Sequence, residues 1–191
     1  MIDKELCADD VRVAYPLFQV DCGGANPTSA LSLLISKCNT KNACHLNKLW
    51  HSRLPYIHWS NVVRNTHSIC FVAESANKYF AVAIWSSPVA QNRMRDGKKI
   101  LELRRFAIAP DAPKNTASRM LSIMRKMICI AFPDIVKLIS YQDTQVHKGT
   151  IYAAAGWLPV SIGKPADWTT SKRTRNKSQT LAQKIRWEKS L

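Results

Sequence analysis

The chain has 191 residues, of which 46% are hydrophobic, and no apolar run approaches the about 18 residues that a membrane-spanning helix needs. Its 28 Lys and Arg against 13 Asp and Glu give a net charge of +15, which predicts a polyanionic partner, nucleic acid rather than a membrane. The acidic N-terminus, MIDKELCADD, lacks a signal core, and the six cysteines lack C-x-x-C spacing, so we expect reduced thiols in the cytoplasm.

Strand and helix patterns alternate along the sequence. In chain order they predict a helix at 28–38, strands at 68–74, 78–85 and 99–110, a helix at 115–132, a strand at 136–141, a short helix at 147–156 and a final strand at 157–162. This order predicts an α+β (mixed α/β) fold with a twisted, mostly antiparallel central sheet flanked by helices, and it is similar to the order of the GNAT acyltransferase fold.

Three divisions follow from these elements. They are an N-terminal strand and helix segment at 1–40, a GNAT-like catalytic core at 41–163 and a basic extension at 164–191. Basic residues of the extension and of the loop at 91–99 are expected to contact phosphates of double-stranded DNA, which gives affinity without reading its sequence.

Three blocks of sequence resemble the Mom family of bacteriophage DNA-modification proteins. They are WHSRLP at 50–55, ELRRFAIAPDAPKNTAS at 102–118 and ISYQDTQVHKGTIYAAAGW at 139–157. Mom proteins are similar to GNAT enzymes and convert adenine in DNA to N6-(carbamoylmethyl)adenine, which protects phage DNA from host restriction. The resemblance implies the same activity for this chain, in the cytoplasm of a host cell.

The resemblance implies catalytic roles for His51, Arg105, Asp143 and Tyr152. Adenine N6 is a poor nucleophile inside the duplex, so an enzyme must extrude the base, remove a proton and stabilise charge on the donor. Asp143 follows a strand at its carboxyl end, where site carboxylates gather, and a helix cap is the alternative. For His51 and Tyr152 the alternatives are ordinary packing roles. Arg105 shares a strand face with Leu103 in a regular strand, where a charge needs a partner.

Four residues near His51 are candidates for binding the substrate: Trp50, Ser52, Arg53 and Tyr56. Aromatic rings beside polar and basic side chains suit an extruded base, and Trp59 offers a further ring. Core packing is the alternative for each ring.

The turn before the helix at 115–132 is the candidate donor site. Its candidate donor-binding residues are Asp111, Lys114, Asn115, Thr116 and Ser118. Free N–H groups at a helix start favour a phosphate or carboxylate. The turn lacks the glycines of the standard GNAT donor loop, so the donor stays open between an acyl-CoA and a glycyl-tRNA.

The resemblance also implies an iron ligand set of His51, Asp143 and Tyr152, since two oxygens and an imidazole suit iron. Cys38 and Cys44 with the adjacent histidine make only a weak zinc pattern. Two other functions stay open: a conventional GNAT N-acetyltransferase using acetyl-CoA, and a non-enzymatic DNA-binding module. The oligomeric state, monomer or homodimer, stays open as well.

Overall fold

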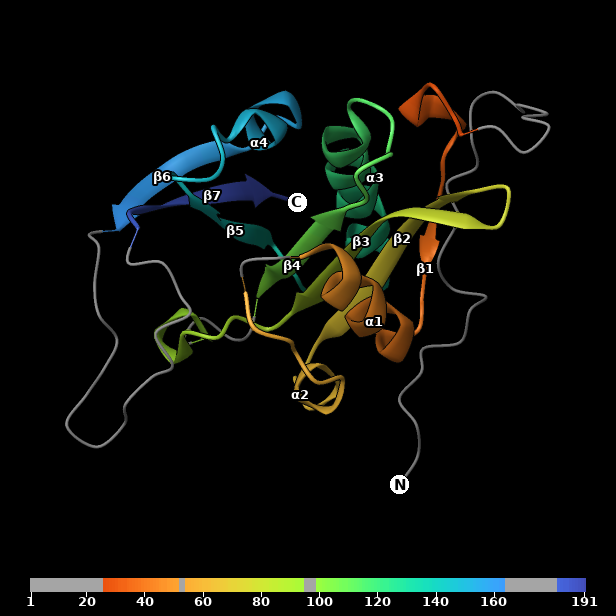
Figure 1. The fold of residues 1–191 in the computed structure, drawn as a ribbon. Coiled ribbons are helices and arrows are strands. Elements are labelled where there is room, and N and C mark those ends of the chain that lie inside the picture. The colour runs from red at the N-terminus through yellow and green to blue at the C-terminus, as the bar shows by residue number, and fades with distance from the viewer. Residues whose placement is uncertain (1–25, 52–53, 95–98, 164–181) are drawn as a thin grey trace.

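The computed structural model describes residues 26–51, 54–94, 99–163 and 182–191, which form a seven-stranded sheet with helices on both faces (Figure 1). The strands are β1 (Leu34–Lys37), β2 (Ser68–Ser75), β3 (Lys78–Ser86), β4 (Ile100–Ile108), β5 (Lys137–Asp143), β6 (Leu158–Gly163) and β7 (Lys184–Ser190). Their order is β1-β2-β3-β4-β5-β7-β6, and every pair is antiparallel except β4 with β5. The predicted fold class is confirmed.

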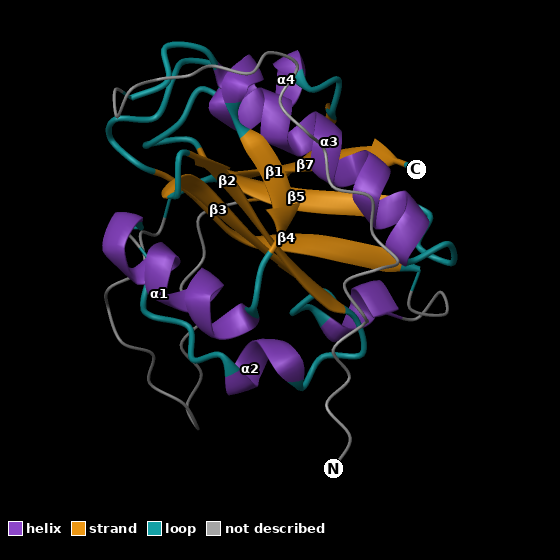
Figure 2. Cartoon of the chain, turned by 90° about the vertical axis from the view of Figure 1, so that its right-hand side faces the viewer, coloured by secondary structure: helices purple, strands orange, loops and turns teal. Residues whose placement is uncertain are grey.

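Helices α3 (Thr116–Ala131) and α4 (Thr150–Ala154) cover one face of the sheet, and α1 (Thr40–Trp50) and α2 (Ser60–Val63) cover the other (Figure 2). The core under α3 includes Trp85 of β3, whose Nε1–H points at the Met124 sulfur, 3.2 Å away. The core under α1 includes Ile84, the next residue of β3 toward the N-terminus. No helix in the described ranges is long and apolar enough to cross a membrane.

The strongest patterns gave the right elements. The predicted helix at 115–132 is α3. Of the six apolar residues expected on its buried face, Ala131 is half-buried and five are buried: Met120, Leu121, Met124, Met127 and Ile128. The predicted strands at 68–74 and 78–85 are β2 and β3, which pair as a hairpin, and Ala76 and Asn77 both have positive φ in its turn. Two consecutive residues in that conformation match the right-handed twist of paired strands.

The helix predicted at 28–38 is wrong. A single 3₁₀ turn, η2 (Ala30–Ser32), is followed by the strand β1, which pairs with β2 from Leu34 opposite Glu74. The apolar run at 31–35 fits either period, and pairing with an open sheet edge decides it. The helix comes next instead, where the Asn39 side chain accepts the Lys41 N–H at 2.7 Å and caps α1.

The end of the basic tail lies inside the sheet. Strand β7 sits between β5 and β6, so the predicted final strand at 157–162 is β6 at the edge and not the last element. Within KIRWEKS only Ile185 and Trp187 are apolar, and the surrounding charges hide the alternation. Trp187 is buried in the core under α3 and α4, so these seven residues belong to the same packed unit as the predicted core.

Candidate functional site

Strands β4 and β5 separate near the middle of the sheet. They pair only from Ile100 opposite Lys137 to Glu102 opposite Ile139; beyond that point β4 pairs with β3 alone and β5 with β7. Beyond Glu102, the edge of β4 that faces β5 therefore has no strand partner among the described residues. The separation lies toward the carboxyl ends of two parallel strands, a common place for a ligand site.

A bulge in β4 sets the direction of Arg105. Ile84 pairs with Arg105 but Trp85 pairs with Leu103, so Arg104 is an extra residue. Paired residues share a face, which puts Leu103 in the core under α3 with Trp85 and Arg105 on the α1 face with Ile84. The prediction that Arg105 shares the face of Leu103 is wrong, because the bulge breaks the alternation.

The half-buried Arg105 guanidinium is held by backbone oxygens. Its Nη1 donates to the Arg104 carbonyl at 2.8 Å and its Nη2 to the Pro55 carbonyl at 3.3 Å, while Nε is buried without a partner among the described residues. Glu102 and Arg104, which a regular strand would place on one face, form no salt bridge with each other. Glu102 accepts the Val89 N–H instead, and burial raises the pKa of its carboxyl.

His51 ends α1 next to Arg105. Burial, the charge of Arg105 and the nearby His147 lower the pKa of His51, so its imidazole is neutral at pH 7. Its Nδ1 accepts the Leu54 N–H at 3.4 Å, which favours the tautomer with the proton on Nε2. His147 lies in the third sequence block but was not predicted as a site residue. Only the folding of the β5–α4 loop toward α1 brings it there.

Asp143, the last residue of β5, lies at the start of the β5–α4 loop. Its Oδ1 accepts the Gln145 N–H at 3.0 Å, and its carbonyl accepts the His147 N–H at 3.0 Å. Alternation along β5 places Asp143 on the face opposite Leu138, which is buried under α3. His51, Arg105 and Asp143 therefore belong to the same face of the sheet, as a common site requires.

Tyr152 lies on the other face. Its ring stacks on Trp187 with centroids 5.4 Å apart, and its hydroxyl is 2.8 Å from the Ser140 hydroxyl. Burial raises the pKa of Tyr152, so the phenol stays protonated. The structure thus gives Tyr152 a packing position in the core, apart from His51 and Arg105.

A cavity of about 250 Å³ lies where the donor was predicted. Its lining comes from the end of β4, the start of α3 and α4: Ile108, Pro113, Asn115, Thr116, Ala117, Ser118, Thr150, Ile151 and Ala154. Three of the predicted donor residues, Asn115, Thr116 and Ser118, are among them. The α4 side of the lining was not predicted, since nothing in the sequence shows that α4 packs beside α3.

The start of α3 offers backbone donors to this cavity. Asn115 is left-handed, with φ of 66°, and its side chain caps nothing. Thr116 N–H is bonded to the Pro113 carbonyl, whereas the N–H groups of Ala117 and Ser118 have no partner within the described chain. These donors, at the positive end of a helix of 16 residues, favour an anion.

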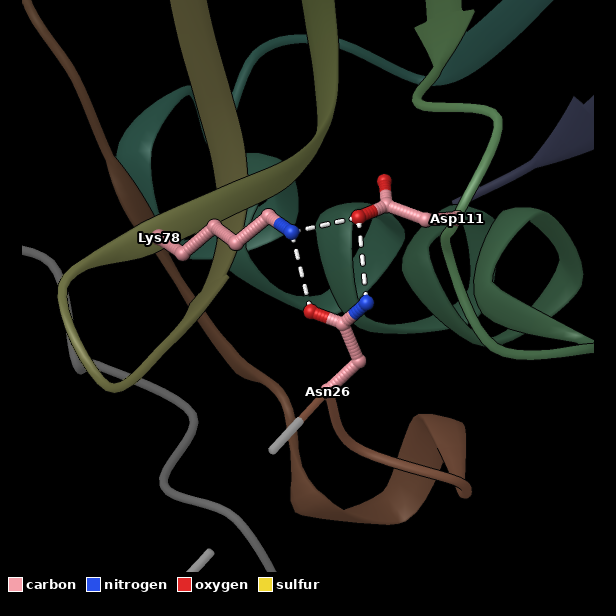
Figure 3. Close-up of polar contacts among 3 residues, drawn as sticks. All are labelled: Asn26, Lys78 and Asp111. Carbon is pink, nitrogen blue, oxygen red and sulfur yellow. Dashed lines mark hydrogen bonds and ion pairs between the residues drawn. The ribbon is translucent and has the colours of Figure 1, made fainter. Parts of the chain in front are cut away.

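Asp111 and Lys114 are not part of the cavity lining. The Asp111 carboxylate forms an ion pair with Lys78 and accepts from the Asn26 amide at 3.3 Å (Figure 3). The hydrogen bond from Lys78 is the main reason that the pKa of Asp111 is lowered. Asp111 therefore ties the loop after β4 to the β2–β3 hairpin, and Lys114 is exposed.

Two predicted substrate residues, Ser52 and Arg53, lie outside the described residues. Trp50 is half-buried and packs against the core under α1, which is the packing alternative. Tyr56 is 51% exposed, and the Lys48 Nζ lies 5.8 Å from its ring centroid. Of the rings of Trp50 and Tyr56, that of Tyr56 is thus the one that remains available to a ligand.

The predicted iron ligands are not brought together, because Tyr152 lies on the face opposite His51 and Asp143. The described residues also contain no group of three or more His, Cys, Asp or Glu that could hold a metal ion. The described cysteines, Cys38, Cys44, Cys70 and Cys129, have free thiols. Burial raises the pKa of Cys70 to about 12, so this thiol is unreactive.

Solved structures with the GNAT fold resemble this chain. An acetyltransferase of the GNAT family from Streptococcus pneumoniae has a TM-score of 0.59 at 10% identity, covering 83% of this chain and 99% of its own. The spermidine N-acetyltransferase from Vibrio cholerae, solved with CoA and spermine, has a TM-score of 0.58 at 11% identity, covering 83% and 95%. At these identities the likeness shows the fold alone: this is a GNAT-fold protein.

The sequence matches the Mom protein family over residues 32–190, and the chain belongs to that family. No curated protein sequence matches it. The match extends from before β1 to the end of β7, so it covers the whole described sheet, including the strand in the basic tail.

Proposed function

We propose that this protein is a transferase that acts on the N6 amino group of adenine in DNA and forms N6-(carbamoylmethyl)adenine, protecting phage DNA from restriction. The observation that carries the proposal is the match to the Mom protein family over residues 32–190. The net charge of +15 supports a nucleic-acid substrate, because each phosphate contact releases counterions.

Three residues on the α1 face support the chemistry. The adenine amino group is conjugated with its ring and must lose a proton as it attacks the acyl carbon of the donor, and Asp143 is the candidate base. The bond from that carbon to the tRNA oxygen or the CoA sulfur breaks, and the tRNA or CoA leaves. A transferred glycyl group gives N6-glycyladenine, which becomes its isomer N6-(carbamoylmethyl)adenine when the glycyl amine displaces the original amino nitrogen at C6. Arg105 stays charged at neutral pH and stabilises negative charge that develops on the donor. His51, neutral with its proton on Nε2, donates a hydrogen bond to the extruded base or to the donor.

The donor reaches these groups from the α3 side in this proposal. Its anionic part binds in the cavity at the N–H groups of Ala117 and Ser118, and its reactive end extends past Glu102, where β4 leaves β5. An acyl-CoA and a glycyl-tRNA both carry phosphates for that position. Incubating the purified protein and duplex DNA with each labelled donor distinguishes them by which label enters the DNA.

Mass spectrometry of nucleosides from bacterial DNA tests the function itself. Expression of the protein should yield a deoxyadenosine heavier by one carbamoylmethyl group, and Asp143→Asn should abolish it. Asp134→Asn makes the same change at an exposed carboxylate just before β5 and should leave modification intact. Unmodified DNA in cells that contain folded protein would refute the proposal. Stoichiometric acetyl-CoA binding in calorimetry would then favour an ordinary N-acetyltransferase.

A further inference from the structure

An exposed row of aromatic rings runs along α1. Tyr56 and Trp59 are 51% and 37% exposed, and the exposed His58 ring lies between them, with centroids 6.4 Å from Tyr56 and 5.4 Å from Trp59. The buried Ile57, 5% exposed, anchors the segment in the core under α1. The rings are thus held outward by a fixed backbone and are not part of the core.

Two lysines of α1 accompany this row. Lys41 Nζ lies 5.0 Å from the Trp59 ring centroid and Lys48 Nζ lies 5.8 Å from that of Tyr56. These lysines are seven residues apart, so they occupy one face of the helix two turns from each other. The surrounding sequence has no acidic residue between Asp21 and Glu74. The segment that carries the rings is therefore aromatic and basic.

The row starts at the candidate active site. The Pro55 carbonyl accepts from Arg105, and the Leu54 N–H donates to His51, so the residues just before Tyr56 are fixed to both site residues. A nucleic-acid strand that delivers a base to His51 and Arg105 would continue over these rings.

We propose that Tyr56, His58 and Trp59 form a stacking platform for unpaired bases of the DNA strand next to the extruded adenine, with Lys41 and Lys48 holding the phosphates. The inference rests on the proposed function and adds the location of the flanking nucleotides. The ring separations exceed the about 3.4 Å between stacked bases along one strand, so the row suits bases that have left the helical stack. The two lysines, in a stretch of sequence without acidic residues, complement a phosphate backbone rather than a basic or apolar protein.

Binding of a fluorescent single-stranded oligodeoxynucleotide by the full-length protein tests this platform. Trp59→Ala should weaken binding about five- to 150-fold, the range for loss of one base–aromatic stack. Tyr79→Ala is the matched control, because Tyr79 is also 37% exposed but lies at the start of β3 beside the hairpin turn. On an oligonucleotide with abasic positions, Trp59→Ala should lose little, because no base remains to stack.

Two further variants separate stacking from charge. Lys41→Ala with Lys48→Ala should lower the slope of log affinity against log salt by about 1.4, from about 0.7 per phosphate contact, whereas Tyr56→Ala should leave the slope unchanged and weaken binding. Tyr56→Ala also replaces the first test if Trp59→Ala misfolds. Equal affinities of Trp59→Ala and Tyr79→Ala would overturn the platform, and Trp59-dependent preference for RNA of the same sequence would overturn the DNA assignment.

Nucleoside mass spectrometry of the wild type separates this inference from the proposed function. Modified DNA with Trp59-independent binding would refute the platform alone. Unmodified DNA with Trp59-dependent binding would refute adenine modification and leave a nucleic-acid surface on α1.

Discussion

Replacing Gly149 with alanine tests how closely the start of α4 packs against Gln142 of β5 and Trp187 of β7. Gly149 has φ of +76°, and an added Cβ would lie 2.5 Å from Gln142 Oε1 and 2.6 Å from Trp187 Cζ2. The left-handed conformation costs alanine about 1–2 kcal/mol and the overlap about 1–3 kcal/mol. The expected loss is therefore about 2–5 kcal/mol of unfolding free energy, a large share of the about 5–15 kcal/mol typical of a domain. Urea titration measures it.

Two other glycines separate the contributions. Gly156→Ala keeps the backbone cost, with φ of +69°, but meets only the flexible Lys189 Nζ at 3.0 Å, so about 1–2 kcal/mol is expected. At Gly163 an added Cβ would lie 3.5 Å from the nearest atom, and alanine there should change stability by at most about 0.5 kcal/mol. A Gly149→Ala loss no larger than that of Gly156→Ala would refute the steric reasoning.

Three further changes test the site. Ser118→Asp should weaken donor binding in calorimetry about tenfold, because it sets a charge against the anion at the start of α3, whereas Ser122→Asp, one turn further, should not. Because the pKa of His51 is lowered in the folded protein, the free energy of unfolding should be highest above the ordinary pKa of about 6.5 and should fall as the pH drops through the folded value. His51→Gln should flatten this fall in urea titrations at several pH values. An unchanged pH profile would contradict the reasoning. Tyr152→Phe removes the contact with Ser140 and should cost about 1–3 kcal/mol while DNA modification persists; lost modification at unchanged stability would instead make Tyr152 catalytic.

The sequence predicted the helices and strands whose hydrophobic pattern depends only on which of their own faces is buried. The apolar face of α3 and the two apolar runs of the β2–β3 hairpin can be recognised from the sequence, because each hydrophobic pattern is long and uninterrupted. Strands β1 and β7 do not. Strand β1 has only four residues, and four of the seven residues of β7 are charged. Each becomes a strand only because it pairs with the edge of a distant strand, β2 or β5. No local pattern contains that pairing.

The sequence predicted a site residue correctly only where its position within its own helix or strand decides what it contacts. Ser118 lines the cavity because it lies in the first turn of α3, which the sequence located. Asp111 looked equivalent, but Lys78 from the hairpin pairs with it. His147 was missed for the converse reason, since its proximity to His51 depends on a loop crossing toward α1. The spacing of residues along the chain does not show which charged residues from distant segments come together in the fold.

The consecutive arginines of β4 show how one residue can organise both sides of such a site. In a regular strand Arg105 would share the face of Leu103 and bury its charge in the apolar core under α3, at a large desolvation cost. Arg104 is the extra residue of the bulge, so Arg105 lies on the α1 face. There its guanidinium donates to the Pro55 carbonyl beside His51. The shift follows Leu103, one residue beyond Glu102, which is the last residue of β4 that pairs with β5. The bulge therefore lies just beyond the point where the strands part, and under the proposed function it turns Arg105 toward the acceptor, which a strand of regular alternation would not do.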